Sequence, residues 1–341
     1  MKIKKVAFRV DGGIKIGLGH IMRSLALAKT FTENTRISFI TQENNIVRSL
    51  LDNCRFKKIY IDDKLEYEEE IKLVKKMILE NNFDIVITDS YDLDQNYLIQ
   101  IKKIVDKLVT IHDFAPFSFP SDIVINGNIY ASDLDYQSLN DNTKFLLGTD
   151  YTLMREEFQN LPKRKINQDV NNILVTVGGS DKLNLTPKIL RGINQLDKKK
   201  LKVDVVVGSG FDNVYGIINE VHKSNFEINL IFNLNKMSEL MLKSDLAISA
   251  GGTTLYELAT TGTPTITLIQ ADNQVLVAEA MEEKGAIINL GFGDQISIKK
   301  IITKVQNLIN DYDRRVSMSQ AGQKIVDGKG VIRVKKEILC Q

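Results

Sequence analysis

The sequence of 341 residues has no tryptophan, only two cysteines and only three histidines. Cys54 and Cys340 lie far apart and outside any CxxC spacing, so the sequence predicts neither a disulfide framework nor a zinc site. The histidines, His20, His112 and His222, are dispersed and show no metal-ligand spacing such as HExxH. We therefore expect no protein-bound metal and no cofactor.

Long apolar runs and an excess of charge of one sign are also missing. No segment approaches the roughly 20 apolar residues that a membrane span needs. The 45 Lys and Arg nearly balance the 43 Asp and Glu, which gives a formal charge of +2 and no electrostatic case for a nucleic-acid or membrane partner. The chain runs straight into a strand-like Val6–Val10 without the apolar core of a signal peptide. We expect a soluble, cytoplasmic protein without stable membrane insertion.

Short β-branched runs alternate with amphipathic stretches along most of the chain. Near-continuous apolar strands separated by helices predict a parallel sheet that is buried on both faces. A polar segment at 161–169 interrupts this pattern before a second, similar series begins. A length of roughly 100 to 200 residues per domain also favours two domains. We predict an α/β protein with Rossmann-like domains at 1–160 and 170–341, a linker at 161–169, and a last helix that packs back on the first domain.

A glycine-rich turn follows the first predicted strand, from Asp11 to His20. Gly17 and Gly19 allow the backbone to approach a ligand closely, and ligands of such sheets bind at the carboxyl ends of the strands, here in the cleft between two domains. His20 falls at the start of the next helix, where the helix field favours a neutral imidazole that can act as a base. A histidine that only caps the helix is the alternative; the glycines and the predicted position favour a base.

Three aspartates each follow a strand of the first domain and could orient His20 or contact a sugar. Asp11 is the first candidate because it lies nearest to His20 in sequence, followed by Asp89 and Asp113. Each of them could equally cap a helix. The sequence does not decide which aspartate supports the histidine.

The second half contains two further glycine pairs after strands. Gly178 and Gly179 precede Asp181, which could cap the following helix. The stretch from Gly251 to Pro264 carries the stronger signal, because Gly251 and Gly252 lead into a helix whose first turn holds Thr253 and Thr254. Their amides and hydroxyls could hold a pyrophosphate without lysine or metal, and the Glu257 carboxylate, further along that helix, could accept both hydroxyls of a ribose.

Together these motifs resemble those of the GT-B nucleotide-sugar enzymes. Within that superfamily the sequence is most similar to the UDP-2,4-diacetamido-2,4,6-trideoxy-β-L-altropyranose hydrolases of the pseudaminic acid pathway and to related spore coat polysaccharide biosynthesis proteins. The resemblance covers most of the chain in short stretches: Phe8–Asp11, Ile16–Arg23, Asp89–Tyr91, Asn126–Tyr130, Leu153–Phe158 and Gly178–Asp181.

The resemblance implies a GT-B fold with two facing Rossmann-like domains and a central cleft, in which the second domain binds UDP. It places the catalytic base on His20 and substrate contacts on Arg155, Glu257 and Asn273. It also implies inverting hydrolysis of a UDP-activated amino or deoxy sugar at C1, for nonulosonic acid or surface polysaccharide synthesis. A diphosphate is already a stable leaving group, so we expect neither a general acid nor a metal to be needed.

Two alternatives stay open from the sequence. In a GT-B glycosyltransferase, His20 would activate an acceptor hydroxyl instead of water, and a lipid-linked acceptor would favour an exposed basic patch on the first domain. Arg36 and Lys57-Lys58 are too sparse in sequence to predict one. A non-catalytic nucleotide-sugar binding protein would keep Glu257 and the glycines but would not need His20.

Overall fold

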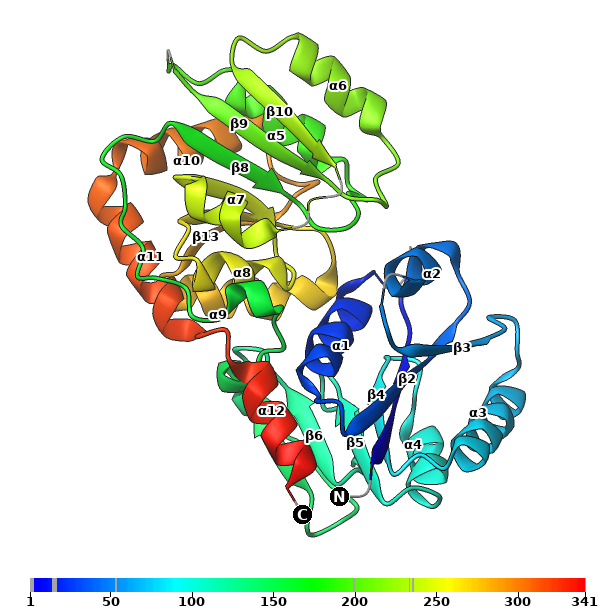
Figure 1. Ribbon diagram of the computed structural model, residues 1–341. Coiled ribbons are helices and arrows are strands. Elements are labelled where there is room, and N and C mark those ends of the chain that lie inside the picture. The colour runs from blue at the N-terminus through cyan, green and yellow to red at the C-terminus, as the bar shows by residue number, and fades with distance from the viewer. Residues whose placement is uncertain are drawn as a thin grey trace. The chain divides into compact units, whose positions relative to one another are not determined.

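The computed structural model describes residues 3–13, 17–52, 54–198, 200–232, 234 and 236–340. The chain divides into two compact units (Figure 1). Unit 1 contains Met1–Arg155 and Lys329–Gln341, and unit 2 contains Glu156–Gly328. The segment expected as a linker, 161–169, therefore lies inside unit 2, and the last helix belongs to unit 1.

The sheet of unit 1 has seven parallel strands among the described residues, in the order β3-β2-β1-β4-β5-β6-β7. Its strands are β1 (Lys4–Val10), β2 (Thr35–Gln42), β3 (Lys57–Ile61), β4 (Ile85–Asp89), β5 (Lys107–Ile111), β6 (Ile123–Asn126) and β7 (Lys144–Leu147). The central strands are buried on both faces, as their continuous apolar sequences require.

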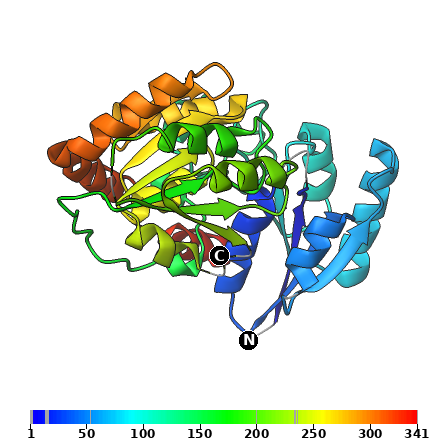
Figure 2. The same ribbon diagram turned by 90° about the horizontal axis from the view of Figure 1, so that it is seen from above.

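Helices cover both faces of this sheet (Figures 1 and 2). One face packs against α1 (Gly19–Thr30), α2 (Asn45–Asp52) and α12 (Gly330–Leu339), and the other against α3 (Tyr67–Asn81) and α4 (Gln95–Lys102). Short 3₁₀ turns form η1 (Ala131–Asp133) and η2 (Thr149–Tyr151). Val331, Val334 and Ile338 of α12 are buried in the same apolar cluster as α1, so the chain end closes the core of unit 1.

The sheet of unit 2 has six parallel strands in its described part, in the order β10-β9-β8-β11-β12-β13. Its strands are β8 (Asn172–Thr176), β9 (Lys202–Val207), β10 (Glu227–Phe232), β11 (Leu246–Ala250), β12 (Thr265–Ile269) and β13 (Ile287–Phe292). The helices are α5 (Leu185–Ile193), α6 (Val214–His222), α7 (Met237–Lys243), α8 (Thr254–Thr260), α9 (Val275–Glu283), α10 (Ile298–Asn310) and α11 (Tyr312–Ile325), with η3 (Glu156–Phe158) and η4 (Asp272–Gln274).

Both sheets reverse their strand order at one point, between β1 and β4 in unit 1 and between β8 and β11 in unit 2. Such a switch point opens a crevice outside the carboxyl ends of the two strands, where ligands of doubly wound sheets bind. The prediction of two Rossmann-like domains is thus confirmed. No described helix is long and apolar enough to cross a membrane.

Candidate functional site

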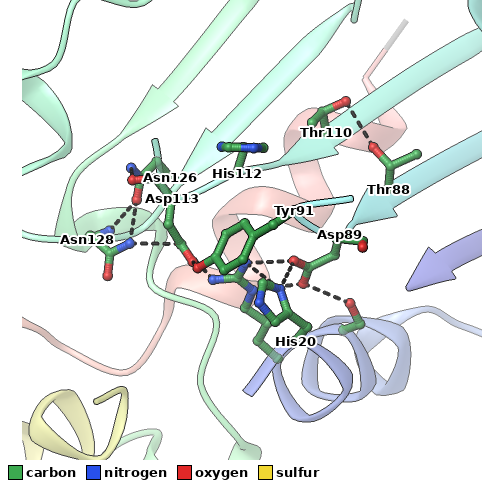
Figure 3. A network of polar contacts seen from close by, with 12 residues as sticks. His20, Thr88, Asp89, Tyr91, Thr110, His112, Asp113, Asn126 and Asn128 are labelled. Atoms are coloured by element: carbon green, nitrogen blue, oxygen red, sulfur yellow. Dashed lines mark hydrogen bonds and ion pairs between the residues drawn. The ribbon is translucent and has the colours of Figure 1, made fainter. Parts of the chain in front are cut away.

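The switch point of unit 1 carries a cluster of charged side chains (Figure 3). Asp89 is the last residue of β4, and Asp113 follows the neighbouring β5 by two residues. His20 and Arg23 come from the first turns of α1, which begins directly after the glycine-rich turn. Parallel strands bring their carboxyl ends to one edge, so residues about 70 to 90 positions apart in sequence meet here.

His20 and Asp89 form a hydrogen-bonded pair. The Nδ1 atom of His20 lies 2.6 Å from Oδ1 of Asp89, and both residues are buried, with His20 5% exposed. The edge of one ring meets the face of the other where His20 packs on Tyr91, with centroids 4.6 Å apart. A carboxylate beside Nδ1 favours the tautomer that carries its proton there, which leaves the lone pair of Nε2 to accept a proton.

Arg23 links this pair to the second aspartate. Its guanidinium donates to both carboxylate oxygens of Asp89, at 2.7 Å and 2.6 Å, and to Oδ1 of Asp113 at 2.7 Å. One of its nitrogens also lies 3.0 Å from Nδ1 of His20. Arg23 is therefore the shared cation of two carboxylates, one of which holds the histidine.

Asp113 is held from several sides. Asn128 donates to its Oδ1 at 2.8 Å, and the Tyr91 hydroxyl donates to its Oδ2. Burial alone would raise the pKa values of Asp113 and Asp89, but the nearby charges of Arg23 and His20 lower both below the ordinary value. Burial, with the Asp113 charge, raises the pKa of Tyr91. At neutral pH both carboxylates are thus ionised and the tyrosine keeps its proton to donate.

His112 lies behind this cluster and has a different environment. Its ring packs against Tyr91, Phe114, Phe117 and Phe119. Burial lowers its pKa, so the ring is neutral at physiological pH. Its contacts are those of an aromatic core residue.

Asp11 does not orient His20, contrary to its ranking from sequence proximity. Its Oδ1 lies 2.6 Å from Nη1 of Arg9 and accepts from the amide of Gln42 at 3.1 Å. Arg9 is itself buried and pairs with Glu70 at 2.7 Å. The sheet order explains the difference, because β4 places Asp89 beside α1 while Asp11 sits among charges from β1 and α3.

Two glycines of the glycine-rich turn pair with each other through their backbones. Gly13 and Gly17 exchange backbone hydrogen bonds of 3.1 Å and 2.8 Å, and Gly17 has a φ of 89°, which favours glycine. No described atom lies within 4 Å of a Cβ placed on Gly17 or Gly19, so both positions leave open space. Ile14, Lys15 and Ile16 of the motif lie outside the described residues.

In unit 2, the first glycine pair shapes the end of β8. Gly178 has a φ of 100°, and the carbonyl of Gly179 accepts from the amide of Gly210 at 3.0 Å. Asp181 accepts from the amides of Leu185 and Thr186, at 2.7 Å and 2.8 Å, and so caps α5. Asp181 is a structural residue of this turn.

The second glycine pair is tied to a glutamine that the sequence motifs did not single out. Oε1 of Gln274 accepts from the amides of Gly251 and Gln270, at 3.1 Å and 2.9 Å. Gln270 in turn donates to the carbonyl of Val177 at 2.8 Å. The two glutamines therefore join the loops that follow β8, β11 and β12. A Cβ on Gly251 would lie 2.9 Å from Cβ of Gln274, so this close approach needs glycine.

The other residues expected to bind substrate are spread over both units. Thr253 precedes α8, and Thr254 and Glu257 lie in its first turn, while Asn273 is exposed in η4 beside Gln274. The structure thus brings these four to the same edge of the unit 2 sheet as Gly251 and Gly252. Arg155 is partly buried at the last position of unit 1 before the boundary.

Two residues of the cluster, Arg23 and Asn128, are not among the site residues predicted from sequence. The signal for Arg23 was its spacing, since residues three apart on a helix share a face. No comparable signal exists for Asn128, because its contact with Asp113 depends on the pairing of β5 with β6. The described residues contain no group of three or more His, Cys, Asp and Glu that could hold a metal.

Residues 172–331 match the family model described as "Glycosyltransferase family 28 C-terminal domain". The chain is 30% identical over 333 residues to the spore coat polysaccharide biosynthesis protein SpsG of Bacillus subtilis, covering 96% of each chain. It is 27% identical to the UDP-2,4-diacetamido-2,4,6-trideoxy-beta-L-altropyranose hydrolase of Campylobacter jejuni, covering 82% of this chain and 97% of that protein. MurG of Acinetobacter baumannii shares the fold with a TM-score of 0.75 at 14% identity, over 98% of this chain and 99% of that one. These likenesses confirm the predicted GT-B fold.

Proposed function

This chain belongs to the family of SpsG and the UDP-2,4-diacetamido-2,4,6-trideoxy-β-L-altropyranose hydrolases, and from that premise we propose that it hydrolyses a UDP-activated amino or deoxy sugar at C1. The products are UDP and the free sugar, which would serve nonulosonic (pseudaminic) acid or surface polysaccharide synthesis. The observation that carries the proposal is the pairing of His20 with Asp89, because it directs Nδ1 to the carboxylate and leaves Nε2 as the base.

In the proposed reaction, Nε2 of His20 takes a proton from a water molecule whose oxygen attacks C1 of the sugar. The bond from C1 to the β-phosphate oxygen breaks, and UDP leaves with the electron pair. Attack from the face opposite to UDP inverts the anomeric configuration. Asp89 stabilises the imidazolium that forms, and a positioned base of this kind contributes roughly 10²- to 10⁴-fold.

Arg23 adjusts the charge around that base. Two ionised carboxylates near one imidazole would favour its protonated form, which cannot take a proton from water. The guanidinium of Arg23 bonds both carboxylates and offsets their charge. We assign Arg23 as a positioning residue that keeps Asp89 aligned with His20.

Unit 2 supplies the UDP site in this proposal, with no charged side chain at the diphosphate. The backbone at the start of α8, with the hydroxyls of Thr253 and Thr254, would bond the diphosphate, because the positive end of a helix dipole favours an anion. The Glu257 carboxylate would accept the ribose hydroxyls, and Gly178 and Gly179 would border the nucleotide. Since this site stabilises the leaving group without a metal, we expect activity in the presence of a chelator.

The sugar contacts proposed from the family resemblance involve residues of both units. Asn273 offers an exposed amide, and Arg155 a cation. Gly17 and Gly19 leave room for close approach of the ligand. Asp11 would take part through its second carboxylate oxygen, which has no hydrogen-bond partner among the described residues. The identity of the sugar substituents depends on contacts such as these.

The test is incubation of the purified protein with UDP-2,4-diacetamido-2,4,6-trideoxy-β-L-altropyranose and other UDP-sugars, without any acceptor. We expect stoichiometric release of UDP, which chromatography measures, and a free sugar of inverted anomeric configuration, which NMR identifies. His20→Ala should slow release roughly 10²- to 10⁴-fold, whereas His222→Ala, which changes an exposed histidine of unit 2, should not. Turnover that is equal in both variants contradicts the assignment of the base.

A glycosyltransferase is the second candidate, favoured by the match of residues 172–331 to a glycosyltransferase family domain. In that case, His20 would deprotonate an acceptor hydroxyl, and the donor site would be the same. Binding of a UDP-sugar without turnover until an acceptor is added would select this function over hydrolysis. Binding without turnover under any condition would select a non-catalytic binding protein.

A further inference from the structure

A concave site lies in unit 1, at the edge of the sheet opposite to His20. It is a cavity of about 530 Å³ at the amino-terminal ends of β1, β2 and β3. Four basic side chains line it, from Lys5, Arg36, Arg55 and Lys57. Arg36 and Lys57 are too sparse in sequence to predict a basic patch, but the sheet brings them together with two further cations.

The strand register places three of these cations on one face of the sheet. Lys5 of β1 is directly opposite Arg36 of β2, and Lys57 of β3 is opposite Ser38 of β2. Residues two apart on a strand share a face, so Arg36 and Ser38 point to the same side. Like charges on directly opposed positions repel and destabilise a sheet. The arrangement therefore carries an electrostatic cost that an anion would remove.

The chain itself supplies little negative charge to offset these cations. The ammonium groups of Lys5 and Lys57 both donate to Asn81, at 2.9 Å and 2.7 Å, and so are held in place by a neutral residue. Arg36 and Arg55 are exposed and form no ion pair with any described carboxylate. Glu33 is the only acidic side chain among the described residues that line the cavity.

Ser38 adds a buried polar group to the same cavity. The residue is 5% exposed and belongs to the cavity lining together with Arg36, the residue two positions before it on β2. A hydroxyl that lines a cavity rimmed with cations is suited to donate to an anionic oxygen.

We propose that this cavity binds a phosphorylated small molecule at a site separate from the catalytic cluster. The planar guanidinium groups of Arg36 and Arg55 match the oxygens of a phosphate, and a cavity of about 530 Å³ has the size of ordinary small-molecule sites. The apolar side chains in its wall, including Phe31, Phe56 and Phe83, are buried and offer no surface for insertion into a bilayer. The ligand is therefore a soluble phosphate ester or diphosphate, not a lipid headgroup.

The test uses inorganic pyrophosphate as the probe, titrated by calorimetry into the full chain in the presence of saturating UDP. Because UDP occupies the nucleotide site, any further binding reports a second site, whatever the outcome of the hydrolase assay. We expect one saturable equivalent. Absence of saturable binding, or binding only to vesicles that contain an anionic phospholipid, overturns the proposal.

Paired variants locate the binding. Arg36→Ala with Arg55→Ala should lower the affinity for pyrophosphate at least about tenfold, since two charge-assisted contacts are lost. Lys103→Ala with Arg314→Ala, which removes the same charge from exposed positions elsewhere, should leave it unchanged. The Arg36 and Arg55 double variant should melt at the same temperature as the wild type or higher, because repulsion is relieved. Pyrophosphate binding that survives this double variant places the anion elsewhere and contradicts the proposal.

Discussion

The switch points of the two units are built from opposite chemistry. In unit 1, the ends of β4 and β5 carry ionised carboxylates that bond Arg23 and His20 at 2.6 Å to 2.7 Å. In unit 2, the ends of β8, β11 and β12 are joined by glutamine and backbone amides, without any charged group in those bonds. The bonds at the unit 1 switch point thus join charged groups. The bonds at the unit 2 switch point, from Gln274 and Gln270 to the backbone, join neutral groups, and we call them the neutral frame.

The difference matches two separate demands of the proposed reaction. Proton transfer requires a base whose charge state changes, so its neighbours must be charged and balanced. A diphosphate leaving group needs only fixed dipoles that do not reorganise as charge develops. The comparison therefore predicts that unit 1 is sensitive to charge changes and pH, while unit 2 is sensitive to backbone shape.

The largest expected effect is that of His20→Ala on turnover. We expect kcat/KM to fall roughly 10²- to 10⁴-fold, because a positioned base is lost. The affinity for UDP should stay within about twofold, since UDP binding is assigned to unit 2. UDP release and calorimetry with UDP measure the two quantities separately. A parallel loss of UDP affinity would show that the two sites are not divided in this way.

Asp113→Asn should reduce stability in a pH-dependent manner. Removing one partner of a buried ion pair costs about 3 kcal/mol at neutral pH. The pKa of Asp113 is lowered in the folded protein from an ordinary value of 3.8. Its charge therefore stabilises the fold above that value, and this contribution is lost as pH falls below it. Urea unfolding at pH 7, 5 and 3.5 should show the wild-type advantage shrinking only at the lowest pH; a constant difference would mean that the charge is irrelevant.

Arg23→Gln should move the pH dependence of turnover. Without the guanidinium, the charges of Asp89 and Asp113 are no longer offset, and uncompensated carboxylates favour the protonated form of a nearby base, so the acid limb of the kcat/KM profile should move to higher pH. The loss of turnover should therefore be largest at low pH and smaller at pH 8.5. Arg23→Lys, which keeps the charge, should shift the limb less. A uniform loss across pH would indicate a purely structural role.

Gly251→Ala tests the neutral frame in unit 2, with Gly252→Ala as its matched control. A Cβ at Gly251 would meet Gln274 at 2.9 Å, whereas the nearest described atom to a Cβ at Gly252 is 3.8 Å away. We expect the first change to cost about 1 to 3 kcal/mol of unfolding free energy and the second less than about 0.5 kcal/mol. Thermal and urea unfolding give both values. Equal effects would mean that the glutamine does not fix this loop.

The same contrast explains what the sequence could and could not predict. Glycine turns and strand periodicity are local signals, so the two parallel sheets and the position of His20 in α1 follow from them directly. Residues that meet through the sheet order leave no such signal. Asp11 lies nearer to His20 in sequence, yet Asp89, 69 positions after His20, is its partner, because the strand order brings the end of β4 beside α1. The role of Gln274 could not be predicted for the same reason, since its bond to Gly251 spans 23 positions.

Two residues show where local sequence motifs mislead. Asp181 follows a glycine pair, but its carboxylate caps α5. Conversely, Arg23 lies on the motif itself, three residues after His20, yet its role depends on two strands that are remote in sequence. Motifs thus located the turns, whereas the sheet order decided which side chains act together.

The most direct measurement is hydrolysis of the UDP-sugar in water enriched in ¹⁸O, with both products analysed by mass spectrometry. If water activated by His20 attacks C1, the label appears in the free sugar and not in UDP, and the His20→Ala variant incorporates none above background. Label in the β-phosphate of UDP would mean attack at phosphorus, and no acceptor-independent incorporation at all would mean that water is not the nucleophile. Either of these results would contradict the account given for His20 and Asp89.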